Sequence, residues 1–213
     1  MTILVVVAVG VERDAVLRDA PPHADVVVDV AGVGPVAAAT AAAAALASRS
    51  YDVVISAGIA GAIPGRAGVG DVVVARASLA GDLGCRTDDG FMSLGDMGLE
   101  QPSLITFDGS AVLRDRLQAN ETPVQYGDIV TLSCMTGTDA DGVALAARFP
   151  DAVAEAMEGW GVAWAARRAG VPAHEVRSIS NIVGRRDPST WDITGALDSL
   201  SRAFAVLLAE PLQ

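Results

Sequence analysis

The chain has 213 residues, of which 51% are hydrophobic and 22 are glycine; its net charge is −11, and its 15 basic residues are all arginine. This length and composition fit one globular α/β domain rather than a disordered or fibrous chain. The negative charge opposes binding to nucleic acid or to an anionic membrane surface, and the lack of lysine excludes Schiff-base chemistry and a P-loop lysine.

Strand-like and helix-like segments alternate along the chain. The expected strands are short apolar or β-branched runs, typical of strands buried on both faces, at residues 3–9, 26–30, 53–57, 71–77, 125–132, 152–155 and 175–179. The expected helices cover residues 35–48, 110–117, 141–148, 158–169 and 190–209. This alternation predicts an α/β fold, a three-layer α/β/α sandwich around a mostly parallel mixed sheet, in a single domain over residues 1–213. Residues 79–107 show little periodicity and are expected to form long loops, near the site or at a subunit contact.

The cysteines and histidines are too few for a disulfide framework or a structural metal site. Cys85 and Cys134 are isolated, and only His23 and His174 could join them as metal ligands. The N-terminal apolar run has no basic leader, and the alanine-rich run at residues 36–47 is shorter than the roughly 20 residues of a membrane span. We therefore expect a cytoplasmic protein with no metal, no cofactor and no membrane or nucleic-acid partner.

Two glycine-rich segments follow expected strands. Gly32-Val33-Gly34 superficially matches a dinucleotide-binding fingerprint, but that function requires an acidic residue at the end of the next strand, and Asp52 stands at its beginning. In the second segment, a turn at Ile59, Ala60 and Gly61 would present backbone amides to the polar edge of a ligand.

Five motifs, read in order, resemble the nucleoside phosphorylase and nucleosidase superfamily: GVGPVAAA, VISAGIAG, GVGDVVVA, AMEG and VRSISN. Within it the chain is similar to the 5′-methylthioadenosine/S-adenosylhomocysteine nucleosidases and to the futalosine hydrolases of menaquinone biosynthesis. The match covers nearly the whole chain, and residues 156–159 and 177–181 are its most specific parts. It implies the α/β/α fold, a purine nucleoside substrate, cleavage of the N-glycosidic bond without a cofactor, and a homodimer or larger homo-oligomer.

The AMEG motif marks the sugar site that the resemblance implies. Met157 would lie against the ribose, and Glu158 would accept hydrogen bonds from its 2′- and 3′-hydroxyls, a role suited to the two oxygens of a carboxylate. An acidic residue is also favoured in the first turn of a helix by the macrodipole, and the sequence favours the sugar-binding role over this structural one.

Asn181 is the main departure from the methylthioadenosine-type nucleosidases, which have an aspartic acid at the matching position. That acid accepts from the adenine 6-amino group and offers a proton towards N7, whereas an asparagine amide donates to the 6-oxo group and N7 of hypoxanthine. The substitution predicts a 6-oxopurine leaving group, and futalosine, an inosine derivative, meets this expectation. The alternative is a side chain that only caps the following turn. The resemblance also implies a substrate contact at Ser180.

Water is the expected nucleophile. Phosphorylases of this superfamily generally hold phosphate with an arginine before the glycine turn and a serine within it, and the matching positions here are Ser56 and Ile59. With Glu12 and Asp14 after the first strand, a phosphate dianion would be held poorly. The resemblance puts Asp14 at the position of the base that activates water, but Glu12 reaches further, so both are candidates.

Other contacts are implied on the base and the 5′ substituent. Met135 and Thr136 match the segment in which relatives stack an aromatic ring on the base, and a methionine sulfur also packs on ring faces. Trp191 would stack on the carboxyphenyl group of futalosine, with Arg185 or Arg186 pairing its carboxylate, or else would belong to the core.

The expected activity is hydrolysis of futalosine to hypoxanthine and dehypoxanthine futalosine. The alternatives are a 6-oxopurine nucleoside phosphorylase, an adenine-specific nucleosidase, and a nucleoside-binding protein without activity.

Overall fold

The central strands form where the sequence has apolar runs whose side chains are buried on both faces. In β1, Ile3 and Val5 belong to the core on one face of the sheet, and Leu4 and Val6 belong to the core on the other. The structure, a computed structural model, describes residues 1–100 and 102–211 and leaves residues 101, 212 and 213 of the predicted domain outside the described range.

The elements of the described residues follow each other in a largely alternating order. The strands are β1 (Ile3–Val7), β2 (Val26–Val30), β3 (Val53–Ala62), β4 (Val72–Ala80), β5 (Gly84–Thr87), β6 (Gly90–Ser93), β7 (Leu104–Thr106), β8 (Val124–Thr131), β9 (Ala152–Ala156) and β10 (Ala173–Ile182). The helices are α1 (Gly10–Arg18), α2 (Pro35–Ser48), α3 (Ser110–Ala119), α4 (Asp139–Arg148), α5 (Gly159–Ala169) and α6 (Ile193–Leu207), with a short 3₁₀ helix at Pro188–Thr190.

The main sheet is mixed and mostly parallel, as predicted. β1 pairs in parallel with β2 and β3, β3 with β10, β4 with β8, and β8 with β9. The antiparallel pairs are β10 with β4, β3 with β9, and β4 with β7. Because β3 pairs with β10 as well as with β9, the strands β3, β10, β4, β8 and β9 close into a ring, a feature the sequence did not predict.

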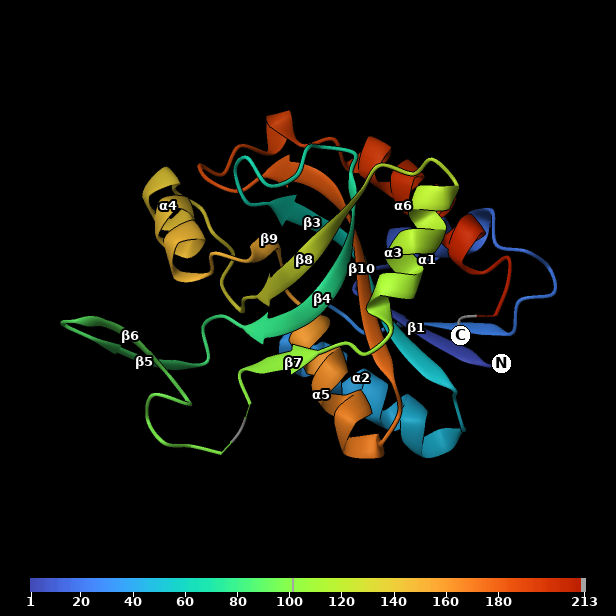
Figure 1. Cartoon of the computed structure of the whole chain (residues 1–213), viewed down its shortest axis with the longest axis horizontal. Helices are drawn as coiled ribbons and strands as arrows, with labels where there is room; N and C mark the ends of the chain where they lie inside the picture. The colour runs from blue at the N-terminus through green and yellow to red at the C-terminus, as the bar shows by residue number, and fades with distance from the viewer. Residues whose placement is uncertain (101, 212–213) are drawn as a thin grey trace.

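Helices cover both faces of this sheet (Figure 1). α1, α3 and α6 pack over one core, which contains Leu113 of α3 and Phe204 of α6. α2 and α5 pack over the other, where the small side chains of Ala38, Ala42 and Ala166 allow the two helices to lie close together. The predicted α/β/α arrangement is therefore confirmed.

Three segments differ from the prediction. Residues 79–107, expected as loops, contain the β5–β6 hairpin, which projects from the body in Figure 1, and β7, which adds to β4. Residues 10–18 form the unpredicted helix α1, whose first turn is stabilised by Glu12. The expected turn at residues 59–61 is instead a continuation of β3, which pairs there with β9 and β10.

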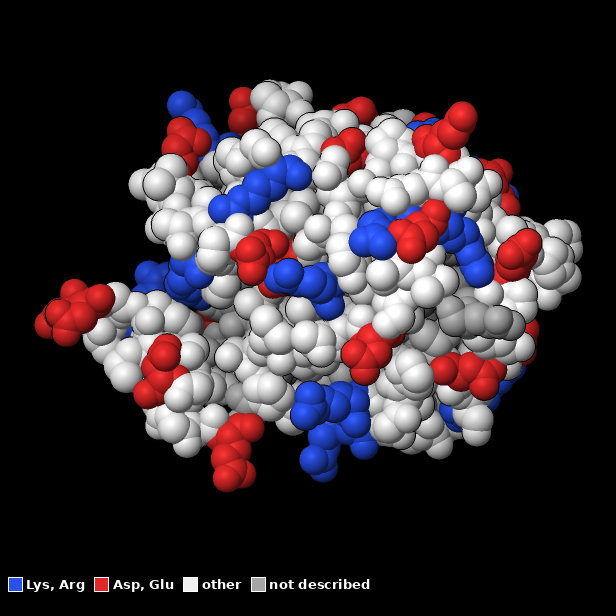
Figure 2. All heavy atoms as spheres, in the orientation of Figure 1, with Lys and Arg blue, Asp and Glu red and all other residues white. Residues whose placement is uncertain are grey.

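The molecular surface mixes charges of both signs. On the face shown in Figure 2, acidic and basic side chains are interspersed. Some surface charges are paired, as Arg76 is with Asp151 at 3.2 Å. Among the described residues, each helix is too short or too polar to cross a bilayer.

Candidate active site

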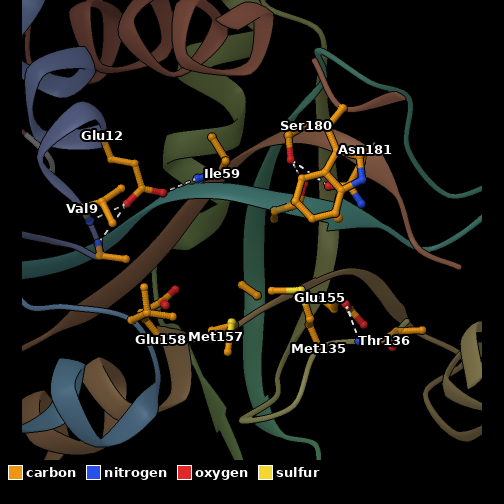
Figure 3. A pocket seen from close by; sticks show the side chains of 16 residues that line it. Val9, Glu12, Ile59, Met135, Thr136, Glu155, Met157, Glu158, Ser180 and Asn181 are labelled. Carbon is orange, nitrogen blue, oxygen red and sulfur yellow. Dashed lines mark hydrogen bonds between the residues drawn. The ribbon is translucent and has the colours of Figure 1, made fainter. Parts of the chain in front are cut away.

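One cavity lies where β1, β3, β9 and β10 end. Its lining combines three carboxylates and an amide with apolar side chains: Ala8, Val9, Glu12, Val33, Ile59, Ala60, Gly61, Met135, Thr136, Glu155, Ala156, Met157, Glu158, Ser180, Asn181 and Trp191. In Figure 3, Glu12 lies across from Glu158 at one end, and Asn181 lies across from Glu155 and Thr136 at the other. The structure thus brings together all the predicted site residues except Asp14, Arg185 and Arg186, which do not line this cavity.

Glu12 is held in the cavity wall by three backbone donors. Its Oε2 accepts from the N–H groups of Ala8 at 2.9 Å and Val9 at 3.2 Å, and its Oε1 accepts from the N–H of Ile59 at 2.9 Å. The side chain is therefore folded back over the start of α1 and is 3% exposed. A Cβ at residue 58 would lie within 3 Å of the Glu12 carboxylate, so Gly58 gives this carboxylate the room to approach β3.

Asp14 points away from the cavity. Side chains two positions apart in a helix are rotated by roughly 200° around the helix axis, so Asp14 and Glu12 point to opposite sides of α1. Asp14 pairs with Arg13 at 2.8 Å, and its side chain is 65% exposed. Of the two acids that the sequence left as candidates, the structure places only Glu12 at the site.

Glu158 immediately precedes α5, but its side chain makes no capping hydrogen bond to that helix. Its Oε1 instead accepts from the N–H of Gly34 at 3.1 Å, and its Oε2 pairs with Arg177 Nη1 at 3.2 Å. The carboxylate is thus oriented by two elements far away in sequence, the start of α2 and β10. Glu158 also stands at the N-terminus of α5, where the helix macrodipole favours a negative charge, so the structural alternative is compatible with this position.

Arg177 lies behind the carboxylates and is completely buried. Its Nε donates to Glu175 at 3.0 Å, and its Nη2 donates to Ser56 Oγ at 3.0 Å. Burial by itself lowers the pKa of Arg177, but the charges of Glu175, Glu158 and Glu12 together raise it above its usual range. The guanidinium therefore stays charged and holds Glu158 in place.

Asn181 and Ser180 enter the same cavity because of a bulge in β10. Neighbouring residues of a regular strand point to opposite faces, but the register with β3 shifts between Ile179 and Asn181. The Ser180 hydroxyl donates to Asn181 Oδ1 at 2.8 Å, and Asn181 Nδ2 donates to the carbonyl of Ile182 at 3.3 Å. The Ser180 hydroxyl also lies 3.2 Å from the carbonyl of Ala60. Since Oδ1 is turned towards Ser180 and one N–H is bonded to Ile182, the amide of Asn181 has one N–H left as a donor.

Of the contacts predicted for the base and the 5′ substituent, Met135 and Trp191 line the cavity, whereas Arg185 and Arg186 do not. Met135 lines it and is 41% exposed, and Trp191 lines it with the guanidinium of Arg186 at 5.4 Å from its ring. The backbone N–H of Arg185 donates to Asp139 at 2.8 Å, and the Arg185 side chain lies outside the lining.

Among the charged residues of the site, sequence analysis assigned no role to Glu155 and Arg177. Glu155 lies within the cavity wall, and Arg177 lies behind it. In both cases the available signal was a charged residue inside a strand that is otherwise almost entirely buried, AVAEA for Glu155 and AHEVRSISNI for Arg177. Such a residue requires a partner, because burying an unpaired charge is costly.

Comparison with known proteins identifies the family of the chain. Residues 23–212 match the family model described as the phosphorylase superfamily. The chain is 46% identical to futalosine hydrolase of Acidothermus cellulolyticus, over 96% of this chain and 89% of that protein. It is 43% identical to futalosine hydrolase of Streptomyces coelicolor, over 97% and 95% of the two chains.

A solved structure has the same fold. The S-adenosylhomocysteine nucleosidase of Streptococcus pyogenes, crystallised with 5-methylthiotubericidin, superposes with a TM-score of 0.84 over 99% of this chain and 98% of that chain, at 24% identity. The chain therefore belongs to the phosphorylase superfamily, in its futalosine hydrolase family.

Proposed function

We propose that this protein hydrolyses the N-glycosidic bond of futalosine and releases hypoxanthine. The observation that carries the proposal is that Glu158 and Asn181 line opposite ends of one cavity, which suits a ligand that presents a ribose to one and a purine base to the other. The relatives named futalosine hydrolase, at 46% and 43% identity, support the same substrate.

The ribose binds at the Glu158 end of the cavity. Gly34 and Arg177 each occupy one oxygen of Glu158, and the remaining lone pairs accept the 2′- and 3′-hydroxyls. As the glycosidic bond stretches, positive charge develops on the ribosyl ring, and the negative charge of Glu158 stabilises it. Met157, next to Glu158 in the lining, packs against the sugar.

The base binds at the Asn181 end. Because Ser180 occupies the amide oxygen, Asn181 offers its amide N–H to an acceptor such as the 6-oxo group of hypoxanthine. A 6-amino group would face this donor with another donor. Hydrogen bonds from Asn181 also stabilise the negative charge that the purine acquires as it leaves.

Water attacks the ribose, with Glu12 as the general base. Glu12 faces Glu158 across the sugar end of the cavity, whereas Asp14 is on the outside of α1. A phosphate nucleophile would require a free cationic group, but the guanidinium of Arg177 is engaged by two carboxylates and by Ser56. These contacts favour hydrolysis over phosphorolysis.

The 5′ substituent of futalosine extends towards Trp191. The carboxyphenyl ring stacks on this indole, and Arg186, whose guanidinium lies 5.4 Å from the indole ring, pairs with the carboxylate. Neither Arg185 nor Arg186 lines the cavity, but Arg186 is the more suitable partner because its guanidinium lies beside the Trp191 ring.

The protein acts in the cytoplasm as a homo-oligomer. Two exposed free cysteines, Cys85 and Cys134, suit a reducing compartment. Val33 and Val36, which are 59% and 79% exposed near the sugar end of the cavity, suit a subunit contact. Light scattering after size-exclusion chromatography measures the mass, and a monomer's mass would refute this part of the proposal.

The test is product release from three nucleosides. Purified protein is given futalosine, inosine or 5′-methylthioadenosine, with and without phosphate, and the free base is measured by chromatography. We expect hypoxanthine from futalosine at a rate that phosphate does not change, and no release from the Glu158→Gln variant. Strict dependence on phosphate would identify a phosphorylase, and efficient release of adenine from methylthioadenosine would identify an adenine nucleosidase.

A further inference from the structure

Glu155 is a carboxylate in the cavity wall that the proposed reaction leaves without a role. It is 8% exposed and lies at the end of β9. Its Oε1 accepts from the N–H of Thr136 at 3.0 Å, whereas its Oε2 is buried and has no hydrogen-bond partner among the described residues. A buried carboxylate oxygen without a donor is costly, so it suits a ligand that brings an N–H or O–H.

The register of the sheet places Glu155 beside Asn181. Gly61 of β3 pairs with Glu155 on one side and with Asn181 on the other. A Cβ at Gly61 would lie 3.3 Å from Asn181 Nδ2 and 3.7 Å from Glu155 Cγ. The amide and the carboxylate therefore flank the same space over Gly61, at the base end of the cavity in Figure 3.

These two groups are complementary to one edge of a 6-oxopurine. Such a base presents an acceptor, O6, next to a donor, N1–H, whereas a 6-aminopurine presents a donor next to an acceptor. Asn181 offers a donor because Ser180 occupies its oxygen, and ionised Glu155 offers only acceptors. We propose that Glu155 accepts the N1–H of the purine while Asn181 donates to O6, so that Glu155 determines specificity for 6-oxopurines.

The contact with Thr136 is part of this recognition. Without Glu155, the N–H of Thr136 would be a donor at the base end of the cavity, and a donor suits N1 of adenine. Glu155 occupies that N–H and replaces it with an acceptor, which suits N1–H of hypoxanthine. The proposal rests on the proposed function and adds to it the atoms that select the base.

The environment of Glu155 explains why a ligand N–H matters. Burial raises the pKa of this carboxyl, and the Thr136 N–H offsets the rise only in part. The ionised form is thus poorly stabilised by the protein and gains most from a donor on the ligand. Adenine N1 is an acceptor, so it would face the carboxylate without a hydrogen between them, at a cost in affinity.

Binding of free bases tests the proposal separately from turnover. Hypoxanthine, 1-methylhypoxanthine and adenine are titrated calorimetrically into wild-type protein and into the Glu155→Gln variant. Glutamine keeps an oxygen for Thr136 but turns an NH₂ donor towards the base. We expect hypoxanthine affinity to fall about 10- to 100-fold in the variant, adenine affinity to be kept or increased, and 1-methylhypoxanthine to bind wild type at least about 10-fold more weakly than hypoxanthine does.

Controls distinguish this from a loss of folding or of function. Asp151→Asn, the same type of change at an exposed neighbour of β9, is expected to leave all three affinities unchanged. Thermal unfolding verifies that Glu155→Gln is folded, and Glu155→Ala provides a second variant with the same expected loss of discrimination. An unchanged ratio of hypoxanthine to adenine affinity in a folded variant would overturn the role of Glu155. If wild type prefers hypoxanthine, the folded Glu155 variants lose this preference, and wild type does not cleave futalosine, the proposed function fails and the role of Glu155 in base selection stands.

Discussion

Replacing Glu12 with glutamine tests which acid activates water. The carboxylate accepts three backbone N–H bonds, from Ala8, Val9 and Ile59, at 2.9 to 3.2 Å. Glutamine has almost the same shape but only one acceptor oxygen, so the variant keeps the bonds to Ala8 and Val9 and sets its NH₂ against the N–H of Ile59. It also loses the ability to take a proton from water.

The expected loss of activity is much larger than the loss of stability. General base catalysis contributes about 10²- to 10⁴-fold, so kcat for hypoxanthine release falls roughly 10³-fold in Glu12→Gln, about 4 kcal/mol of transition-state stabilisation. The lost hydrogen bond to Ile59 costs about 1 to 3 kcal/mol of folding free energy. KM changes little, because the ribose and base contacts of Glu158 and Asn181 are retained.

Asp14→Asn is the matched control, with the same chemical change two residues away. Since Asp14 is exposed and, among the residues that the structure describes, pairs only with Arg13, we expect kcat within about twofold of wild type. Initial rates of hypoxanthine release at saturating futalosine, with urea unfolding of each variant, separate catalysis from stability. Activity within tenfold of wild type in a folded Glu12→Gln variant, or a comparable loss in Asp14→Asn, would refute the assignment of the base.

Three further changes test other contacts. Asn181→Asp removes the amide donor to O6 and should lower kcat/KM for hypoxanthine release by about 10- to 100-fold, and unchanged rates would show that residue 181 does not contact the base. Arg177→Met leaves the carboxylates of Glu175 and Glu158 buried without a cation and should cost about 3 to 5 kcal/mol in urea unfolding; an unchanged midpoint would contradict the buried ion pairs. Burial lowers the pKa of His174 to about 4 from 6.5, so between these pH values the unfolded chain binds more protons than the folded one. The free energy of unfolding therefore decreases as the pH is lowered from 6.5 to 4, by roughly 3 kcal/mol at most. Unfolding at pH 7 and pH 4.5 should show a smaller loss in His174→Phe than in wild type, and equal losses would contradict this contribution.

Local patterns in the sequence were sufficient for the framework. The uninterrupted β-branched runs gave the buried strands because side chains on both faces of a central strand must be apolar. The AMEG and VRSISN motifs identified Glu158 and Asn181, which the structure brings to one cavity. Each of these inferences depends on a few neighbouring residues.

What the sequence could not provide depends on contacts between distant segments. The choice between Glu12 and Asp14 depends on the helical conformation of residues 10–18, in which the two side chains point in opposite directions. The proximity of Glu155 to Asn181 depends on the pairing of β3 with both β9 and β10, which no single strand reveals. The same pairing closes the ring of five strands and extends β3 through the residues that were predicted to form a turn.

The most direct test of the central claim is a competition between two nucleosides in one reaction. Futalosine and 5′-methylthioadenosine are mixed at equal concentration with wild-type protein in phosphate-free buffer, and free hypoxanthine and adenine are followed together. The amide of Asn181 and the carboxylate of Glu155 are matched to a 6-oxopurine, so we expect hypoxanthine to be released at least about 100-fold faster than adenine. Release of adenine at an equal or greater rate would contradict the account.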